Sequence, residues 1–352
     1  MIVDRLSSYL RTGSCIASSF LKGYVSDCLY IAYPSQEKPS LANKICFVFK
    51  TCTLPLQLVL YGAAIVFDNI ATKLSSRTYY KLEGQLNTVA GEMTIYSCNI
   101  SMLDYGISAI DGLSRPSERI SAVAKKILSS NATVICLQEV SFYHAKLLWQ
   151  ELKKEYCQGY TRTVDVMPYS LIDSGLFIAS KVPIQQIRYF SLSNSGFIPR
   201  GVVAVCYEDY WILNTHLSSK DKLERKQQFQ ELINICNSLC QEKNVPCFVC
   251  MDGNIERTAD PYDEFSSLDV NEFFLLPQSD NEGFSVSLEN ATAVDSFLKD
   301  NPKPIYIDYV LCYRPSAQHV EFSTQLDRLF SFDESLLRLS DHHAIVAKIE
   351  II

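Results

Sequence analysis

Residues 340–351 read SDHHAIVAKIEI, and this stretch predicts how the chain completes its fold. An acid and an imidazole, Asp341 and His342, stand immediately before an alternating apolar run. Alternation with a period of two is typical of a β-strand. A single Asp-His pair at a strand edge is more often a solvated turn, so its meaning depends on the other motifs of the chain.

Four further polar motifs each end or follow a β-rich apolar run. In chain order they are SCN at 97–99, LQEV at 137–140, NTHL at 214–217 and MDGN at 251–254. Functional sites of α/β sheets form at the ends of strands, where such side chains gather. Read together with the Asp-His pair, the motifs indicate a metal-assisted phosphodiesterase.

From residue 93 onward, strand-like and helix-like segments alternate. Two segments have helical periodicity, 116–128 and 223–240, each with its apolar residues on one face. This order predicts a layered α/β sandwich. The strand-like runs, rich in β-branched and aromatic residues, are TIYSCNI, ATVICLQ, SGLFIAS, GVVAVCY, YWILNTH, PCFVCMD, IYIDYVLC and HHAIVAKIEII.

Charge and cysteine usage limit the classes of partner and compartment. The net charge is −7, but residues 1–88 hold nine Lys or Arg against five Asp or Glu, which is +4 and leaves −11 for the rest. An acidic catalytic part argues against a nucleic-acid partner, whereas a basic front end suits an anionic membrane surface. The thirteen cysteines are scattered through apolar segments, so we expect a reducing compartment that faces the cytosol.

An apolar run at 45–67 marks the N-terminal region. It reads ICFVFKTCTLPLQLVLYGAAIVF, and Lys50, Pro55 and Gln57 interrupt it. Its unbroken part, 58–67, is too short to span ~30 Å of hydrocarbon. It is either a core helix or a monotopic or re-entrant membrane hairpin bent at Pro55, and the basic flanks favour the membrane. We therefore expect a membrane-associating region at 1–88 and a catalytic domain at 89–352.

Two side chains are candidates for holding a divalent metal. Glu139 follows the buried run 134–137, and Asn99 occupies the same position after an earlier strand. Hard cations such as Mg²⁺ prefer oxygen ligands and take one or two protein carboxylates. Taken singly, such a Glu usually belongs to a helix start and such an Asn to a turn.

The remaining candidates supply acid-base chemistry. His342 suits a general base because an imidazole titrates near neutral pH. Asp308 lies within an apolar run, where a carboxylate is costly unless paired, so we expect it to orient His342. Asp252 and Asn254 bracket a tight turn and could position water or a phosphate oxygen. His216 ends a strand and is either structural or a second proton carrier.

The ordered motifs resemble the endonuclease/exonuclease/phosphatase superfamily, from about residue 93 to residue 352. Within it the chain is similar to the neutral sphingomyelinases, the membrane-associated brain-type form in particular. YIDYVL at 306–311, SGLFIASKVPI from 174, RGVVAV from 200 and FSTQL from 322 also resemble that branch.

The resemblance implies a four-layered α/β sandwich of two packed β-sheets flanked by helices. It implies Mg²⁺, with Mn²⁺ as a substitute, and hydrolysis of sphingomyelin to ceramide and phosphocholine. By it, the metal-site positions are Glu139, Asn99 and Asp341, and the catalytic positions are His342, Asp308, His216, Asp252 and Asn254.

Two departures from the branch affect regulation and substrate placement. Gly253 replaces an aromatic residue in the GDFN motif, and VSFYHAK after Glu139 lacks the Asp-Lys pair of the brain-type form. Alternative functions are a phosphoinositide phosphatase, a nuclease, or a catalytically weak membrane adaptor that docks through residues 1–88.

Overall fold

The structure is a computed structural model, and its described part begins in the N-terminal region and runs with gaps to residue 351. The described residues are 21, 25–26, 50–74, 79–85, 93–103, 113–162, 174–194, 196, 199–257, 264–279, 285–286, 306–316, 320–327 and 339–351.

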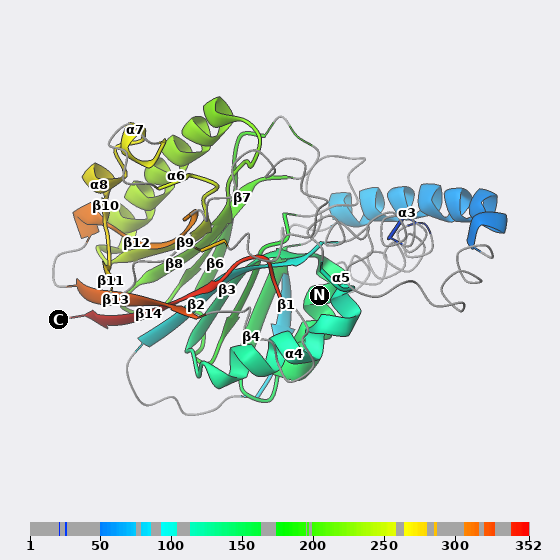
Figure 1. Cartoon of the computed structure of the whole chain (residues 1–352), viewed down its shortest axis with the longest axis horizontal. Coiled ribbons are helices and arrows are strands. Elements are labelled where there is room, and N and C mark those ends of the chain that lie inside the picture. Colours follow the sequence, from blue (N-terminus) through cyan, green and yellow to red (C-terminus); the bar gives the residue numbers. More distant parts are fainter. Residues whose placement is uncertain are drawn as a thin grey trace.

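Two β-sheets pack against each other (Figure 1). The eight-stranded sheet has the order β1 (Tyr79–Glu83), β4 (Gln158–Arg162), β5 (Phe177–Ser180), β3 (Val134–Val140), β2 (Met93–Met102), β14 (Ala344–Ile351), β13 (Val320–Asp327) and β11 (Gln278–Ser279). The six-stranded sheet has the order β10 (Phe274–Leu275), β12 (Asp308–Tyr313), β9 (Cys247–Asp252), β8 (Trp211–His216), β7 (Gly201–Cys206) and β6 (Gln186–Ser191).

Helices cover the outer faces of both sheets, which gives four layers. The helices α4 (Pro116–Ser129) and α5 (Phe142–Leu152) pack on the eight-stranded sheet. The helices α6 (Lys222–Lys243), α7 (Glu264–Ser267) and α8 (Val270–Phe273) lie on the six-stranded sheet. A short 3₁₀ turn, η2 (Arg314–Ser316), follows β12. The predicted α/β sandwich is confirmed.

The alternation within the strands builds the three hydrophobic cores between these layers. In β3, Val134 and Cys136 face the core between the sheets, whereas Ile135 and Leu137 face α4 and α5. Both faces of the strand are therefore covered, and β3 is apolar from Val134 to Leu137.

Local signals account for the two predicted helices, which the structure contains. Pro116 begins α4, where its missing N–H costs no hydrogen bond, and Glu118 accepts from the backbone N–H of Arg115. The side chain of Asp221 caps α6 by accepting from two backbone amides, and Asn244 ends the helix in a left-handed conformation.

All eight predicted strand-like runs contain a strand, but several elements were not predicted. These are α5, the two short helices α7 and α8, the strands β1, β4, β6 and β13, and the two-residue strands β10 and β11. β1 pairs with β4 and lies inside the region expected at 1–88, so the eight-stranded sheet extends into that region.

The apolar run near the N-terminus forms helix α3 (Leu54–Leu74), which extends away from the sheets at the right of Figure 1. Pro55 lies in its first turn, and residues 45–49 fall outside the described part. None of the described helices is both long and apolar enough to cross a membrane. α3 nevertheless leaves large apolar side chains in solvent, namely Leu56, Leu58, Val59, Val66, Phe67 and Ile70.

A buried polar cluster links the two sheets. Asn214 on β8 donates from Nδ2 to the carbonyls of Leu137, at 2.9 Å, and Phe177, at 3.0 Å. Its Oδ1 accepts from Gln138 Nε2 on β3 at 2.7 Å. Asn214 is fully buried, so water cannot reach its amide and these three bonds satisfy it instead.

We predict that Asn214→Ala lowers the free energy of unfolding by about 2–4 kcal/mol, because it removes three bonds and leaves buried groups unpaired. Urea unfolding followed by circular dichroism measures the change. Asn237→Ala, on the exposed face of α6, is the control and should cost less than about 0.5 kcal/mol. Equal effects of the two variants would contradict the prediction.

Candidate active site

Strand register gathers one half of the candidate site on the six-stranded sheet. β8 and β9 are parallel, and His216 pairs with Asp252 at their shared end. β9 and β12 are antiparallel, and Asp252 is also the register partner of Asp308. Three polar residues from three neighbouring strands therefore lie side by side at one edge of the sheet.

The eight-stranded sheet supplies the other half. The parallel pair β2 and β3 brings Asn99 next to Gln138 in register, so that Glu139 emerges at the same edge. β14 pairs with β2, which places the segment before β14 beside Asn99. There the hydroxyl of Ser340 donates to the Asn99 carbonyl at 2.7 Å and accepts from the backbone N–H of His342 at 3.1 Å.

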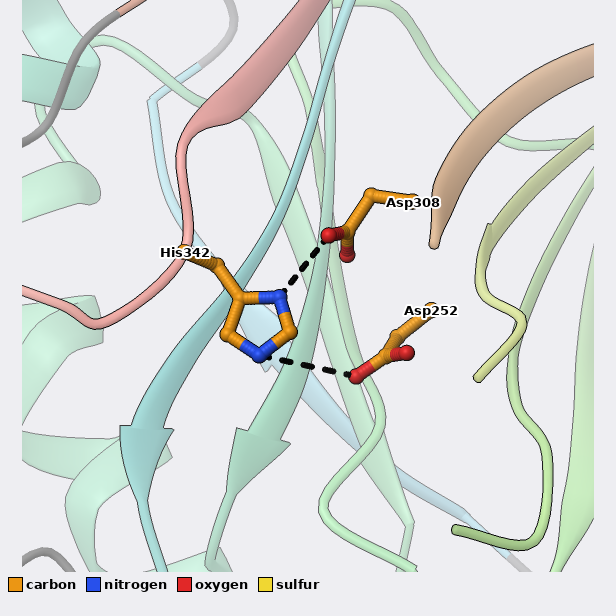
Figure 2. Close-up of side chains that lie close together, drawn as sticks. All are labelled: Asp252, Asp308 and His342. Atoms are coloured by element: carbon orange, nitrogen blue, oxygen red, sulfur yellow. Dashed lines mark hydrogen bonds and ion pairs between the residues drawn. The ribbon is translucent and has the colours of Figure 1, made fainter. Parts of the chain in front are cut away.

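His342 stands between two carboxylates (Figure 2). Its Nδ1 lies 2.8 Å from Asp308 Oδ2, a hydrogen bond, and its Nε2 lies 4.0 Å from Asp252 Oδ2. A proton on Nδ1 that is donated to Asp308 leaves the Nε2 lone pair directed toward Asp252. The predicted contact between His342 and Asp308 is present, and both side chains are buried.

His216 and Asn99 converge on Asp252 as well. His216 Nε2 lies 3.4 Å from Asp252 Oδ2, and its Nδ1 lies 3.9 Å from Glu139 Oε1. Asn99 Nδ2 donates to Asp252 Oδ2 at 2.9 Å, while its Oδ1 accepts from the backbone N–H of Ser101. Asn99 therefore presents its amide nitrogen, not its oxygen, to the acids.

Glu139 adopts a left-handed backbone conformation, with φ 58°. This conformation costs a non-glycine residue about 1 kcal/mol, and neighbouring structure must hold it in place. Gly175 packs against Glu139 so closely that a Cβ on Gly175 would lie 2.8 Å from the Glu139 Cα. The carbonyl of Gly175 accepts from the backbone N–H of Val140. The turn directs Glu139 into the site, where its side chain is 20% exposed.

Asn254 and Asp341 lie at the margins of this cluster. Asn254 donates from its backbone to Asp252 Oδ1 and from its side chain to the carbonyl of Leu217. Asp341 Oδ1 lies 3.4 Å from the hydroxyl oxygen of Ser340, and burial, followed by the charge of Asp341, raises the pKa of Glu139. The structure thus brings all eight predicted site residues to one end of the two sheets, and their individual roles remain predictions.

Gly253 of the MDGN motif lies in a turn that packs against β12. A Cβ on Gly253 would lie 3.4 Å from the ring of Tyr309 and 3.3 Å from the carbonyl of Ile307. The ring of Tyr309, whose hydroxyl donates to the carbonyl of Ile255, therefore occupies the space beside the turn. Gly253 is buried beside this ring.

Buried negative charge controls the titration of the carboxyl groups. Burial, followed by the charge of Asp308, raises the pKa of Asp252 from 3.8 to about 7, although His342 and Asn99 oppose the shift. Burial and the charge of Asp341 also raise the pKa of Glu139. Like charges that share a site with little water cannot all ionise freely.

The two histidines respond in opposite directions. Burial lowers the pKa of His342, but the carboxylates, with Asp308 first, outweigh it, and the pKa lies well above the ordinary value. Burial and the positive charge of Arg200 hold the pKa of His216 well below its ordinary value. His216 is consequently neutral near pH 7 and acts as a hydrogen-bonding group.

The donor set fits a hard divalent cation. One atom from each of Asp252, Asp308 and His342 lies within 4.8 Å of the others. Asp308 Oδ1 is buried and has no hydrogen-bond partner in the described part of the chain. Carboxylate oxygens are the ligands that Mg²⁺ prefers, and Glu139 adds a further one at the solvent side.

Residues outside the predicted set also hold the site together. The fully buried guanidinium of Arg119, on α4, donates to the carbonyls of Ile100, Ser101 and Leu339, and so joins the end of β2 to the segment before His342. Arg200 donates to the His216 carbonyl at 3.5 Å. The only sequence signal for Arg119 was its place on the apolar face of a helix, where an arginine needs buried acceptors.

Known proteins share this architecture. The profile of the Endonuclease/Exonuclease/phosphatase family matches residues 96–342, more than two-thirds of the chain. The chain belongs to this family. The match includes every predicted site residue, which explains why the resemblance in the sequence was carried by the same motifs.

Individual relatives are sphingomyelinases. Sphingomyelinase C 2 of Leptospira interrogans is 25% identical over 280 residues, which are 71% of this chain and 44% of the relative. The chain therefore spans less than half the length of that relative. This similarity confirms the predicted likeness to sphingomyelinases.

Two solved structures show the same fold. Sphingomyelinase C from Streptomyces griseocarneus superimposes with a TM-score of 0.55 at 16% identity, over 74% of this chain and 99% of that one. A beta toxin variant from Staphylococcus aureus with bound magnesium ions gives 0.59 at 18% identity, over 73% and 99%.

We predict that Mg²⁺ raises the melting temperature more at about pH 8 than at about pH 5.5, as differential scanning fluorimetry would show. The pKa of Asp252 is 3.8 in the unfolded chain and about 7 in the folded protein. Between these two pH values the unfolded chain has released the Asp252 proton, whereas the folded protein keeps it. Without metal, stability therefore falls as the pH rises through this window, and a cation reverses the loss once Asp252 is ionised.

Asp252→Asn should weaken the pH dependence of the melting temperature without metal and the pH dependence of the Mg²⁺ effect, because the amide does not titrate. Glu321→Gln, an exposed substitution on β13, is the control and should leave them unchanged. A Mg²⁺ effect that is the same at both pH values would contradict the prediction.

Proposed function

We propose that the protein is a Mg²⁺-dependent phosphodiesterase that hydrolyses sphingomyelin to ceramide and phosphocholine at a membrane surface. One observation carries the proposal: His342, hydrogen-bonded to Asp308, faces the carboxylate of Asp252 within a cluster that combines metal-binding and acid-base groups. The similarity to sphingomyelinases C supports this choice of substrate.

The 4.0 Å gap between His342 Nε2 and Asp252 Oδ2 exceeds a direct hydrogen bond and suits a bridging water. In the neutral form of His342 that base catalysis requires, both atoms accept hydrogen bonds, so such a water donates both hydrogens and directs its lone pairs outward. His342 takes one proton as the water oxygen attacks phosphorus. Asp308 holds the imidazole in the required tautomer and stabilises the imidazolium.

The other polar groups orient the reacting atoms. Asn99 and His216 both contact Asp252 Oδ2 and fix that carboxylate. One amide hydrogen of Asn254 remains for a phosphate oxygen while the other binds the Leu217 carbonyl. The bond from phosphorus to the ceramide oxygen breaks, and that oxygen leaves as the ceramide hydroxyl once it is protonated. We assign this protonation to the imidazolium of His342, which has taken the proton of the attacking water, because His216 is neutral near pH 7.

Glu139, Asn99 and Asp341 are the residues we assign to Mg²⁺, with Asp252 beside them. Asn99 Oδ1 would have to leave the backbone N–H of Ser101 in order to bind the ion. A bound cation neutralises the charge that develops on the phosphoryl oxygens and offsets the carboxylate charge that keeps His342 protonated. Mn²⁺ has similar ligand preferences and is the expected substitute.

A phospholipid is favoured over a nucleic acid as substrate. The catalytic part carries the whole negative balance of the chain, −11 against +4 for residues 1–88. A phosphate backbone would be repelled by this charge. An adaptor without catalysis would have no need of an ordered Asp308–His342 pair beside buried carboxylates.

We predict that Asp308→Asn lowers kcat for phosphocholine release from sphingomyelin by about 10²–10⁴-fold with little change in KM, because it removes the group that orients His342. The assay uses sphingomyelin vesicles with Mg²⁺, and EDTA should abolish release. Asp209→Asn, an exposed substitution in the turn between β7 and β8, is the matched control. Faster cleavage of plasmid DNA or of inositol lipids would overturn the proposed substrate.

The exposed face of α3 is our proposed contact with lipid. Val59 is 70% exposed and Val66 is 55% exposed, and both lie on a helix outside the packed layers. The region up to residue 88 is net basic, which suits an anionic surface that faces a reducing, cytosolic compartment.

We predict that Val59→Ser with Val66→Ser lowers activity on vesicles by about tenfold or more, because burying one valine is worth about 1.5 kcal/mol. Activity on detergent-dispersed sphingomyelin should stay unchanged. Leu223→Ser, at the most exposed large apolar side chain of α6, is the control. Equal losses on both substrates would remove the docking role of α3.

A further inference from the structure

The Asp308–His342 pair spans the two sheets, so no strand ladder fixes its spacing. Asp308 belongs to β12 of the six-stranded sheet, and His342 precedes β14 of the eight-stranded sheet. β12 pairs with β9 and β10, while β14 pairs with β2 and β13. Something other than sheet pairing must set the distance between the carboxylate and the imidazole.

Ser285 contacts the carboxylate side of this pair. Its hydroxyl oxygen accepts from the backbone N–H of Ile307 at 2.9 Å and from that of Asp308 at 3.1 Å. The residue is fully buried. These two bonds hold the start of β12, and the carbonyl of Ile307 in turn accepts from the N–H of Gly253 next to Asp252.

The same short segment contacts the imidazole side. The carbonyl of Ser285 accepts from the backbone N–H of His343 at 2.7 Å. Val286 forms an isolated antiparallel bridge with His342 itself. A single residue therefore bonds the backbone at Asp308 through its side chain and the backbone next to His342 through its main chain.

We propose that Ser285 is a positioning residue, which holds Asp308 and His342 at hydrogen-bonding distance across the two sheets. For its kinetic consequence the inference rests on the proposed function, but its structural consequence does not need a substrate. The simpler alternative is that Ser285 only satisfies two buried amides. That role would affect stability without affecting the contact between the two side chains.

The first readout is the proton on His342 Nδ1, because an imidazole N–H that is bonded to a carboxylate gives a strongly downfield proton NMR resonance. The chain has five histidines, and loss of the resonance in Asp308→Asn assigns it. In Ser285→Ala we expect the resonance to vanish or to move upfield. In Ser285→Thr, which keeps the hydroxyl, we expect it to be retained.

The matched control is Ser180→Ala. Ser180 is also fully buried, and its hydroxyl bonds the backbone of Val182 as donor at 2.6 Å and as acceptor at 3.2 Å. It pairs with Val134, at the end of β3 opposite Glu139. This variant should lose melting temperature and keep the downfield resonance.

The second readout is steady-state kinetics on sphingomyelin. A displacement of about 1 Å can cost about 10²-fold in rate, so we expect kcat of Ser285→Ala to fall by about 10–10²-fold with KM unchanged. Ser285→Thr should recover most of it, and Ser180→Ala should keep normal kcat.

An unchanged downfield resonance in a folded Ser285→Ala protein overturns the inference, whatever the activity. Should the wild-type protein fail to cleave sphingomyelin, the proposed function falls, and the NMR comparison still decides the role of Ser285. If Ser285→Ala does not fold, the comparison of Ser285→Thr with Ser285→Cys decides, because the thiol is a weak acceptor. Equal resonances in these two variants would overturn the inference.

Discussion

The hydrogen bond between Asp308 and His342 is the interaction on which the rest of the site depends. It joins a residue of the six-stranded sheet to one beside the eight-stranded sheet at 2.8 Å, and both side chains are buried. A bond of this kind forms only if both sheets end at the same level and keep their packing. The link at Asn214 joins the two sheets, and Arg119 holds the segment before His342 to the end of β2.

The second constraint is the concentration of negative charge at this edge. Asp252, Asp308 and Glu139 lie together, with Asp341 near enough to raise the pKa of Glu139. Without a cation the protein tolerates this charge by keeping protons, as the pKa of about 7 for Asp252 shows. Full ionisation of these carboxylates destabilises the folded protein, and a divalent ion bound among them offsets that loss of stability. Stability, pH and metal binding are therefore linked in one equilibrium.

The fold was predictable wherever burial on both faces left a continuous apolar run. β3, β7, β8 and β9 are such strands, and each was predicted close to its observed bounds. β6 is an edge strand with partly exposed residues, so its sequence lacks that signal. α5 begins at Phe142, three residues after Glu139, and was not predicted.

The candidate site was also predictable only in part. The sequence by itself determined which residues are candidates for the site, because carboxylates, amides and imidazoles at strand ends are recognisable by their chemistry and order. It also determined that Asp308 needed a partner, since an ionised carboxylate within an apolar run is costly alone. Only the tertiary structure decided which atom meets which: that Asn99 turns its nitrogen to Asp252, that Gly175 supports the strained Glu139, and that Ser285 bridges the pair. These contacts join residues far apart in the chain, and their geometry follows from sheet register and packing, which no local pattern encodes.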